Sequence, residues 1–162
     1  MAVIVFGSIN TDIALGVGHL PVPGETVLTA GYQAVPGGKG CNQAVAAAKL
    51  GADVRMVGAV GDDAMAEVPM AAMQAARVDT NDVRVADRPT GLAAVMVAED
   101  GENAIVVASG ANLSVRADQL RDVRAGDVLV CQMEVPFTET SAALLAAKAA
   151  GAVTVLNLAP FG

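Results

Sequence analysis

Apolar and polar positions alternate along the chain in blocks that predict strands and helices in turn. Near-continuous apolar runs of strand length are typical of strands buried on both faces of a parallel sheet. These runs cover residues 3–9, 54–60, 127–132 and 153–158. Between them the pattern predicts helices over 42–50, 64–77, 115–123 and 138–150, and all of these stretches except 115–123 are rich in alanine. The alternation predicts an α/β fold.

Capping and breaking residues refine two of these helices. Gly51 is expected to close the helix over 42–50, because glycine adopts the backbone angles that end helices. Asp62 and Asp63 supply an N-cap for the next helix, which runs to Arg77. Pro69 lies about two turns inside that helix, so we expect it to remove a backbone hydrogen bond and to kink the helix.

Two segments interrupt the alternation. Residues 14–35 are rich in glycine and proline and contain short β-prone pieces such as 26–29, which predicts short strands and turns. Residues 92–98 and 104–108 are strand-like runs, and the Glu99–Asn103 connection between them predicts a hairpin. We expect these segments to form a small second sheet that covers the functional site.

Polar side chains follow two of the buried strands. Asn10 and Asp12 come at the end of the first strand, and Glu134 follows the third. Ligands of open α/β sheets bind at the carboxyl ends of strands. Residues two apart on an extended backbone face the same way, so Asn10 and Asp12 can grip adjacent hydroxyls. The alternatives are an Asx-turn or helix cap for this pair, and a solvated loop for Glu134.

A glycine-rich loop, Pro36–Gly40, leads directly into the first predicted helix. A helix start presents unpaired N–H groups and partial positive charge, to which Lys39 adds a cation and Asn42 an amide. This combination suits a polyhydroxylated or phosphorylated small molecule. The loop lacks the glycine spacing and the Ser/Thr of a P-loop. An ordinary strand-to-helix turn is the alternative.

Composition excludes several classes. A chain of 162 residues, 54% of them hydrophobic, predicts one domain with one good core. Its apolar runs fall short of the roughly 20 residues that span a bilayer, and its start is too short for a signal peptide, so we expect a cytoplasmic protein without membrane contact. A net charge of −7 argues against nucleic-acid binding. Cys41, Cys131 and the single His19 fit neither a disulfide framework nor a zinc site.

Several motifs in one order resemble the PfkB family of carbohydrate kinases, and specifically the N-terminal half of its ribokinase-like members. The segments that carry the resemblance are 7–12, 23–26, 37–44, 61–63, 90–91, 110–112 and 132–134. The resemblance implies that residues 1–162 are part of a Rossmann-type αβα sandwich with a β-sheet lid formed by 14–35 and 91–108. It implies ATP-dependent phosphorylation of a pentose, D-ribose to ribose 5-phosphate, by the complete family member.

The resemblance also implies roles for individual residues. Hydrogen bonds to the sugar would come from Asn10, Asp12, the backbone at Gly38, Lys39, Asn42 and Glu134. Small apolar lid contacts would come from Ala93, Val95 and Val107. The family further implies ATP, Mg²⁺ and a monovalent cation as cofactors, and a homodimer formed through the lid sheet.

Departures from the family pattern limit these expectations. The family's catalytic aspartate lies in a Gly-Ala-Gly-Asp motif, which this sequence lacks, as it lacks the Asn-x-x-Glu motif that organises Mg²⁺. We therefore assign no catalytic or metal-binding residue here, and we expect the chain alone not to transfer phosphate. Smaller departures are Cys41 where alanine is usual, Arg77 where glycine is usual, and Pro69. The alternatives are a non-catalytic sugar-binding or dimerising half-protein and a truncated inactive fragment.

Overall fold

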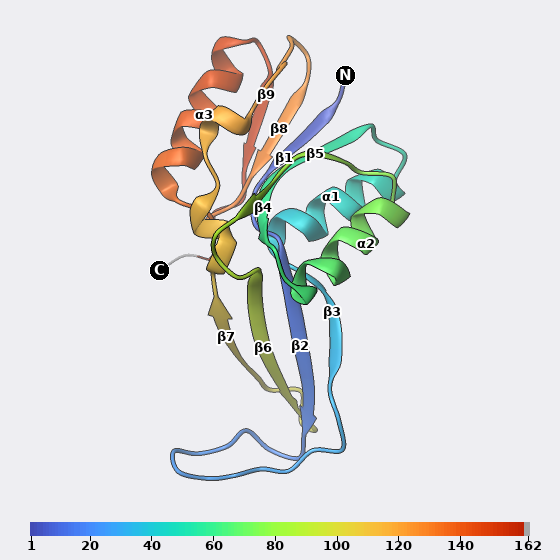
Figure 1. Ribbon diagram of the computed structural model, residues 1–162, viewed down its shortest axis with the longest axis vertical. Coiled ribbons are helices and arrows are strands. Elements are labelled where there is room, and N and C mark those ends of the chain that lie inside the picture. The colour runs from blue at the N-terminus through green and yellow to red at the C-terminus, as the bar shows by residue number, and fades with distance from the viewer. Residues whose placement is uncertain (161–162) are drawn as a thin grey trace.

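The computed structural model, which describes residues 1–160, contains a five-stranded parallel sheet between two layers of helices (Figure 1). Its strand order is β5-β4-β1-β8-β9. The strands are β1 Val3–Phe6, β4 Val54–Gly61, β5 Asp79–Ala86, β8 Val128–Cys131 and β9 Val153–Leu156. The helices are α1 Lys39–Lys49, α2 Glu67–Ala75 and α3 Phe137–Ala149. The predicted α/β class is confirmed.

Alternating side chains of the central strand β1 build two cores. Ile4 and Phe6 point to one face of the sheet, where they pack in a cluster with residues of α3. Val5 points to the other face and packs with residues of α1 and α2. All three side chains are at most 1% exposed. A strand buried on both faces requires this continuous apolar run. Within the described part of the chain, no helix is both long and apolar enough to cross a bilayer.

A second, four-stranded sheet extends from the first and forms the lower half of the molecule in Figure 1. Its order is β3-β2-β6-β7, with β2 Asn10–Val17, β3 Gln33–Gly37, β6 Gly91–Ala98 and β7 Asn103–Ala108. We call this sheet the lid. The predicted hairpin is present as the antiparallel pair β6 and β7. The first strand ends at Phe6, earlier than predicted, and β2 begins at Asn10, so the two sheets meet at the predicted polar residues.

The β-prone piece at 26–29 is not a strand, so that prediction was wrong. This piece lies in the long connection between β2 and β3, whose side chains are almost all exposed. Its one tertiary hydrogen bond in the described structure runs from the Thr29 hydroxyl to the Gly16 carbonyl, at 2.6 Å. A β-prone sequence without a neighbouring strand has no ladder to join.

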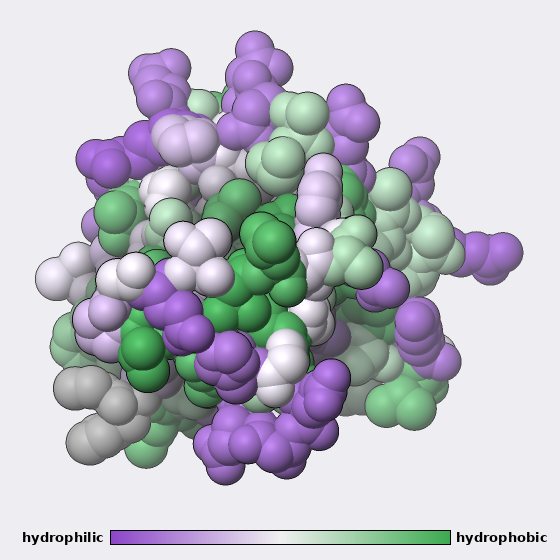
Figure 2. All heavy atoms as spheres, turned by 90° about the horizontal axis from the view of Figure 1, so that it is seen from below, coloured by the Kyte–Doolittle hydropathy of each residue, from purple (hydrophilic) through white to green (hydrophobic). Residues whose placement is uncertain are grey.

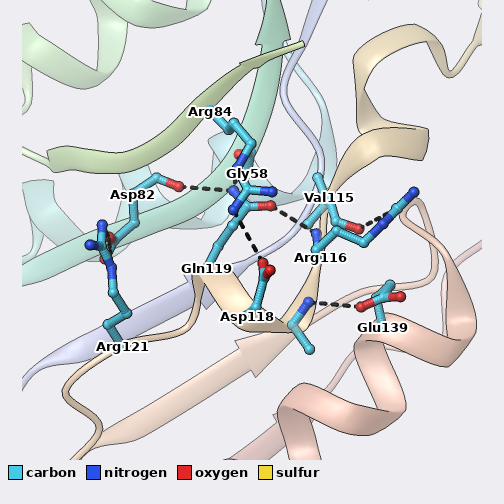
Figure 3. A network of polar contacts seen from close by, with 10 residues as sticks. Gly58, Asp82, Arg84, Val115, Arg116, Asp118, Gln119, Arg121 and Glu139 are labelled. Carbon is cyan, nitrogen blue, oxygen red and sulfur yellow. Dashed lines mark hydrogen bonds and ion pairs between the residues drawn. The ribbon is translucent and has the colours of Figure 1, made fainter.

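The predicted helix over 115–123 is also wrong, because the short 3₁₀ turn η3 Ala117–Gln119 stands in its place, preceded by another, η2 Gly110–Ser114. Arg116 between them is extended, with φ −131°. Figure 3 shows the cause: the buried side chain of Gln119 points to the sheet and donates to the carbonyls of Gly58, at 2.8 Å, and Asp82, at 3.1 Å. It also accepts a hydrogen bond from the Arg116 N–H. These bonds replace the helical ladder.

Strand β5, which the sequence pattern did not indicate, lies at the sheet edge. Most of its side chains are polar and at least partly exposed, which conceals it from a search for apolar runs. Its buried residue is Asp82, whose carboxylate pairs with Arg121 at 2.6 Å and with Arg55 at 3.2 Å. The register between β4 and β5 shifts beside Asp82, between Arg55 and Val57 of β4.

Pro69 does not lie two turns inside a helix, so the expected kink was wrong. Asp63 caps the 3₁₀ turn η1 Ala64–Ala66 by accepting a hydrogen bond from Ala66 N at 3.2 Å. The α-helix begins only at Glu67, which puts Pro69 in its first turn, where an N–H has no helical partner. Arg77 follows this helix with φ 62°, the left-handed conformation that favours glycine.

Candidate functional site

The glycine loop brings the start of α1 against the connection between β1 and β2. A Cβ added to Gly38, whose φ is 83°, would lie 2.9 Å from the backbone nitrogen of Asn10 and the carbonyl oxygen of Ser8. A Cβ on Gly40 would lie 2.6 Å from the same Ser8 oxygen. That oxygen accepts a hydrogen bond from the backbone N–H of Cys41 at 2.9 Å. Glycine is therefore required here by close backbone approach.

Glu134 joins three segments at this point. One carboxylate oxygen accepts hydrogen bonds from the Ser8 hydroxyl at 2.5 Å and from the backbone N–H of Lys39 at 2.9 Å. The other accepts from Lys39 Nζ at 2.7 Å. Burial by itself raises the pKa of Glu134, but the hydrogen bonds from Lys39 and Ser8 outweigh it and hold the pKa below its ordinary value. Glu134 is thus an anion with one oxygen still able to accept.

Asp12 lies beside this group with an acceptor that is not used. Its Oδ1 is buried and has no hydrogen-bond partner within residues 1–160. Burial raises the pKa of Asp12, the Glu134 carboxylate raises it further, and Lys39 opposes both. The carboxylate rests directly on Gly37, where a Cβ would lie 1.9 Å from Oδ1. A hydroxyl group placed here would supply the missing donor.

Asn10 and Asp12 share one face of β2, as their spacing predicts. Both lie inside a strand, so the Asx-turn and helix-cap alternatives do not apply to them. Asn10 is 3% exposed, and its Oδ1 accepts a hydrogen bond from Asn112 Nδ2 at 2.7 Å. An amide and a carboxylate therefore lie side by side at the junction of the two sheets.

A cavity of about 260 Å³ opens beside Asn10, between the lid and the end of β8, and Asp12 is not among its lining residues. Three of the predicted residues, Asn10, Val107 and Glu134, line it. Sequence reasoning gave no role to its other lining residues, Ser109, Asn112, Leu113, Met133, Val135, Pro136 and Pro160. The Gly110-Ala111-Asn112 motif was the available signal, because it had already contributed to the family resemblance.

The strand register explains which lid residues approach the site. Asp12 pairs with Ala93 on β6, and Ala93 pairs in turn with Val107 on β7, so one row of the lid carries a carboxylate and two apolar side chains. Val95 is two residues farther along β6, opposite Ala14, and does not line the cavity. Of the three predicted lid contacts, only Val107 lines the cavity; Ala93 lies between Asp12 and Val107 in the row and, like Val95, does not line it.

Asn42 is the predicted residue that the structure does not bring into this group. It lies in the first turn of α1, where its backbone N–H bonds to the Gly38 carbonyl at 3.0 Å. Its side chain is exposed and makes no hydrogen bond to residues 1–160. The predicted contact between Asn42 and a sugar stays a prediction.

The described residues do not form a donor set for a metal ion. Nowhere in residues 1–160 do three His, Cys, Asp or Glu side chains gather closely enough to hold one. Burial raises the pKa of the Cys41 thiol to about 11 and that of Cys131 to about 12, so both thiols are neutral packing groups. The cation of the polar group around Glu134 is the Lys39 ammonium.

Sequence comparison places close relatives among ribokinases. The chain is 40% identical over 161 residues to the ribokinase of Haemophilus influenzae, covering 96% of this chain and 53% of that one. It is 34% identical over 164 residues to the ribokinase of Mus musculus, covering 98% and 51%. The chain thus spans about half the length of the curated relatives it matches.

Solved structures agree. The structure of Arabidopsis thaliana ribokinase complexed with ribose and ATP matches with a TM-score of 0.86 and 36% identity, over 98% of this chain and 54% of that one. Ribokinase from Cryptococcus neoformans in complex with ADP matches with a TM-score of 0.87 and 35% identity, over 99% and 52%. The family model described as pfkB family carbohydrate kinase matches residues 2–161. This chain belongs to the pfkB family of carbohydrate kinases.

Proposed function

We propose that this chain is the sugar-binding and lid half of a ribokinase, which transfers a phosphoryl group from ATP to D-ribose and yields ribose 5-phosphate. The curated relatives named ribokinase support this proposal, as does the Arabidopsis thaliana structure, which is complexed with ribose and ATP. The GGKGxNQA run over 37–44 together with GSINxD over 7–12 favours ribokinase over fructokinase or nucleoside kinase relatives.

The observation that carries the proposal is the unused acceptor of Asp12. A buried acceptor without a partner destabilises a fold by about 1–3 kcal/mol, so its presence calls for an explanation. Asp12 is close enough to Lys39 and Glu134 for both to act on its pKa, and Ala93 is its neighbour in the strand register of the lid. A ligand hydroxyl would satisfy the unused acceptor. The cavity of about 260 Å³ is just below the roughly 300–1,000 Å³ of pockets for drug-sized ligands, which suits a monosaccharide.

Each polar group of the site has a distinct part in recognition. Asp12 accepts a hydroxyl hydrogen, Asn10 presents an amide, and the Glu134 oxygen bonded to Lys39 Nζ can accept one more hydrogen. Ala93 and Val107 cover the C–H side of the sugar and exclude water. Phosphoryl transfer depends on positioning and on neutralisation of charge, and this half of the site supplies the positioning. ATP supplies the phosphoryl group when bound.

The lid is also the surface through which we propose that two copies associate in the cytoplasm. Seen from the lid end, Figure 2 shows apolar surface among hydrophilic groups. Exposed apolar lid residues include Val97 at 42% and Ile105 at 55% on one face of the lid, and Val106 at 66% on the other. Apolar patches of this kind mark contacts between proteins. Sedimentation equilibrium tests this part: a mass independent of concentration and equal to one chain would refute it.

The test of the sugar site is Asp12→Ala in the full-length protein, measured by calorimetry with D-ribose and by ribose-dependent ADP formation. We expect a loss on the order of 2–4 kcal/mol in ribose binding or in kcat/KM. The control is Asp100→Ala, which removes a carboxylate at the exposed turn between β6 and β7. It should leave ribose binding and kcat/KM unchanged. Unchanged kcat/KM in Asp12→Ala would remove Asp12 from the site. Ribose binding without ADP formation in the wild type would favour the non-catalytic sugar-binding alternative.

A further inference from the structure

Asn112 is a fully enclosed amide that joins the turn η2 to the connection between the two sheets. It is 1% exposed. Its Oδ1 accepts a hydrogen bond from the backbone N–H of Ile9 at 2.9 Å. Its Nδ2 donates to the Ile9 carbonyl at 3.3 Å and to Asn10 Oδ1 at 2.7 Å. Every hydrogen of the Asn112 amide thus has a partner.

These contacts fix the orientation of two amides in succession. The backbone N–H of Ile9 can only donate, so the atom of Asn112 that faces it must be the oxygen. The NH₂ group of Asn112 therefore faces Asn10. Asn10 accepts this hydrogen bond with its side-chain oxygen, Oδ1. The NH₂ group of Asn10 is then the part of its amide that can donate a hydrogen bond into the cavity, which Asn10 and Asn112 both line. Two backbone groups of Ile9 thus decide how Asn10 points.

Gly91 provides the room for this pair. A Cβ added to Gly91 would lie 2.2 Å from Asn10 Oδ1 and 2.4 Å from Asn112 Nδ2. Gly91 does not have a positive φ, so its backbone conformation does not require glycine. Space for the amide pair is the reason for glycine at this lid position.

We infer that Asn112 is a positioning residue that holds Asn10 as a hydrogen-bond donor toward the sugar. This inference rests on the proposed function. A fixed donor at Asn10 and a free acceptor at Asp12, two residues apart on one strand face, match two neighbouring hydroxyls that respectively accept and donate. The pair would select sugars that carry both hydroxyls.

The first experiment replaces Asn112 by aspartate in the full-length protein. Asn112→Asp keeps the acceptor for Ile9 N–H but offers Asn10 an oxygen, so the Asn10 amide turns over and presents its carbonyl to the cavity. We expect the ribose affinity, measured by calorimetry, to fall about tenfold or more. The matched control Asn103→Asp makes the same change at the exposed start of β7 and should leave the affinity unchanged. A ribose affinity equal to wild type in Asn112→Asp overturns the inference.

Deoxy sugars distinguish positioning from a merely structural role. In the wild type, 2-deoxy-D-ribose and 3-deoxy-D-ribose should each bind more weakly than ribose. In Asn112→Asp, the deoxy sugar that lacks the hydroxyl next to Asn10 should bind less than about twofold more weakly than ribose. The affinity loss of the other deoxy sugar should be the same as in the wild type. An equal loss of affinity for all three sugars, with both deoxy sugars as weak relative to ribose as in the wild type, would mean that Asn112 acts only on the fold.

Two further measurements keep the inference testable if Asn112→Asp does not fold. Asn10→Asp retains the hydrogen bond from Asn112 but cannot donate to a ligand, so it should fold and lose ribose affinity; wild-type affinity would overturn the inference. In the ligand-free wild type, NMR should show slower hydrogen exchange for the Asn112 side-chain amide than for exposed Asn103. Equal exchange rates would refute the hydrogen bond between Asn112 and Asn10, whether or not ribose binds. Slow exchange without any ribose binding would instead refute the proposed function.

Discussion

Replacing Gly37 by alanine should disable the proposed sugar site by displacing the carboxylate of Asp12, although residue 12 itself is unchanged. A Cβ at Gly37 would lie 1.9, 2.1 and 2.4 Å from the three carboxylate atoms of Asp12, whereas ordinary contacts begin at 3.4 Å. The carboxylate must therefore move by about 1.5 Å, enough to break a hydrogen bond of ordinary length. Gly37 has no positive φ, so alanine adds no backbone strain. The clash with Asp12 is the main effect.

The expected size follows from the lost contact. A hydrogen bond to a charged group contributes about 1.5–3 kcal/mol, so the ribose affinity of Gly37→Ala should fall roughly 10- to 150-fold. The free energy of unfolding should change by less than about 1 kcal/mol, since the displaced side chain can rotate. Calorimetry with D-ribose measures the first quantity, and urea denaturation measures the second.

A matched control and a double variant test the reasoning. Gly16→Ala adds the same methyl group elsewhere in the lid, where a Cβ would meet nothing within 4 Å, and should bind ribose normally. In an Asp12→Ala background, Gly37→Ala should have almost no further effect, because both changes act on the same carboxylate. Independent, additive losses would refute the proposed coupling, as would wild-type affinity in Gly37→Ala alone.

Three further substitutions probe the fold around the site. Arg77→Gly should raise the free energy of unfolding by about 1 kcal/mol, because Arg77 adopts φ 62°; an unchanged urea midpoint would contradict this. Gln119→Leu should lower it by about 1–3 kcal/mol, since two backbone carbonyls and one N–H lose their partner; a midpoint equal to wild type would contradict this. Glu134→Gln should destabilise the protein at neutral pH. Because the folded state lowers the pKa of Glu134 from 4.5, that difference should vanish as pH falls below the folded pKa, and a difference constant with pH would exclude the ionised carboxylate as its cause.

The sequence predicted those elements whose pattern is set by burial. Strand β1 and helix α1 are present because continuous apolar runs and alanine-rich stretches leave few other packed arrangements. The hairpin of β6 and β7 follows from local turn chemistry. These features depend on neighbours along the chain, which sequence patterns report directly.

The failures arise where distant contacts decide the local structure. The stretch 115–123 has a composition that suits a helix, yet Gln119 bonds to carbonyls of β4 and β5, far away in the sequence. Strand β5 is polar and was missed, because its hydrogen bonds to β4 rather than an apolar run define it. The prediction put Pro69 inside the α-helix because it took the 3₁₀ turn before α2 as part of that helix. None of these contacts leaves a local signal.

The polar residues of the site also divide into features that the local sequence predicts and features that only distant contacts determine. Spacing alone put Asn10 and Asp12 on one strand face, but it could not show that the acceptor of Asp12 is left unused while Glu134, Ser8 and Lys39 satisfy one another. Burial and Glu134 raise the pKa of Asp12, so its charge is held in an unfavourable place until a donor arrives. A hydroxyl that donates to Asp12 favours the ionised carboxylate, so we expect the pKa of Asp12 to fall when such a ligand binds, and an unchanged pKa in the ribose complex would refute this role of Asp12.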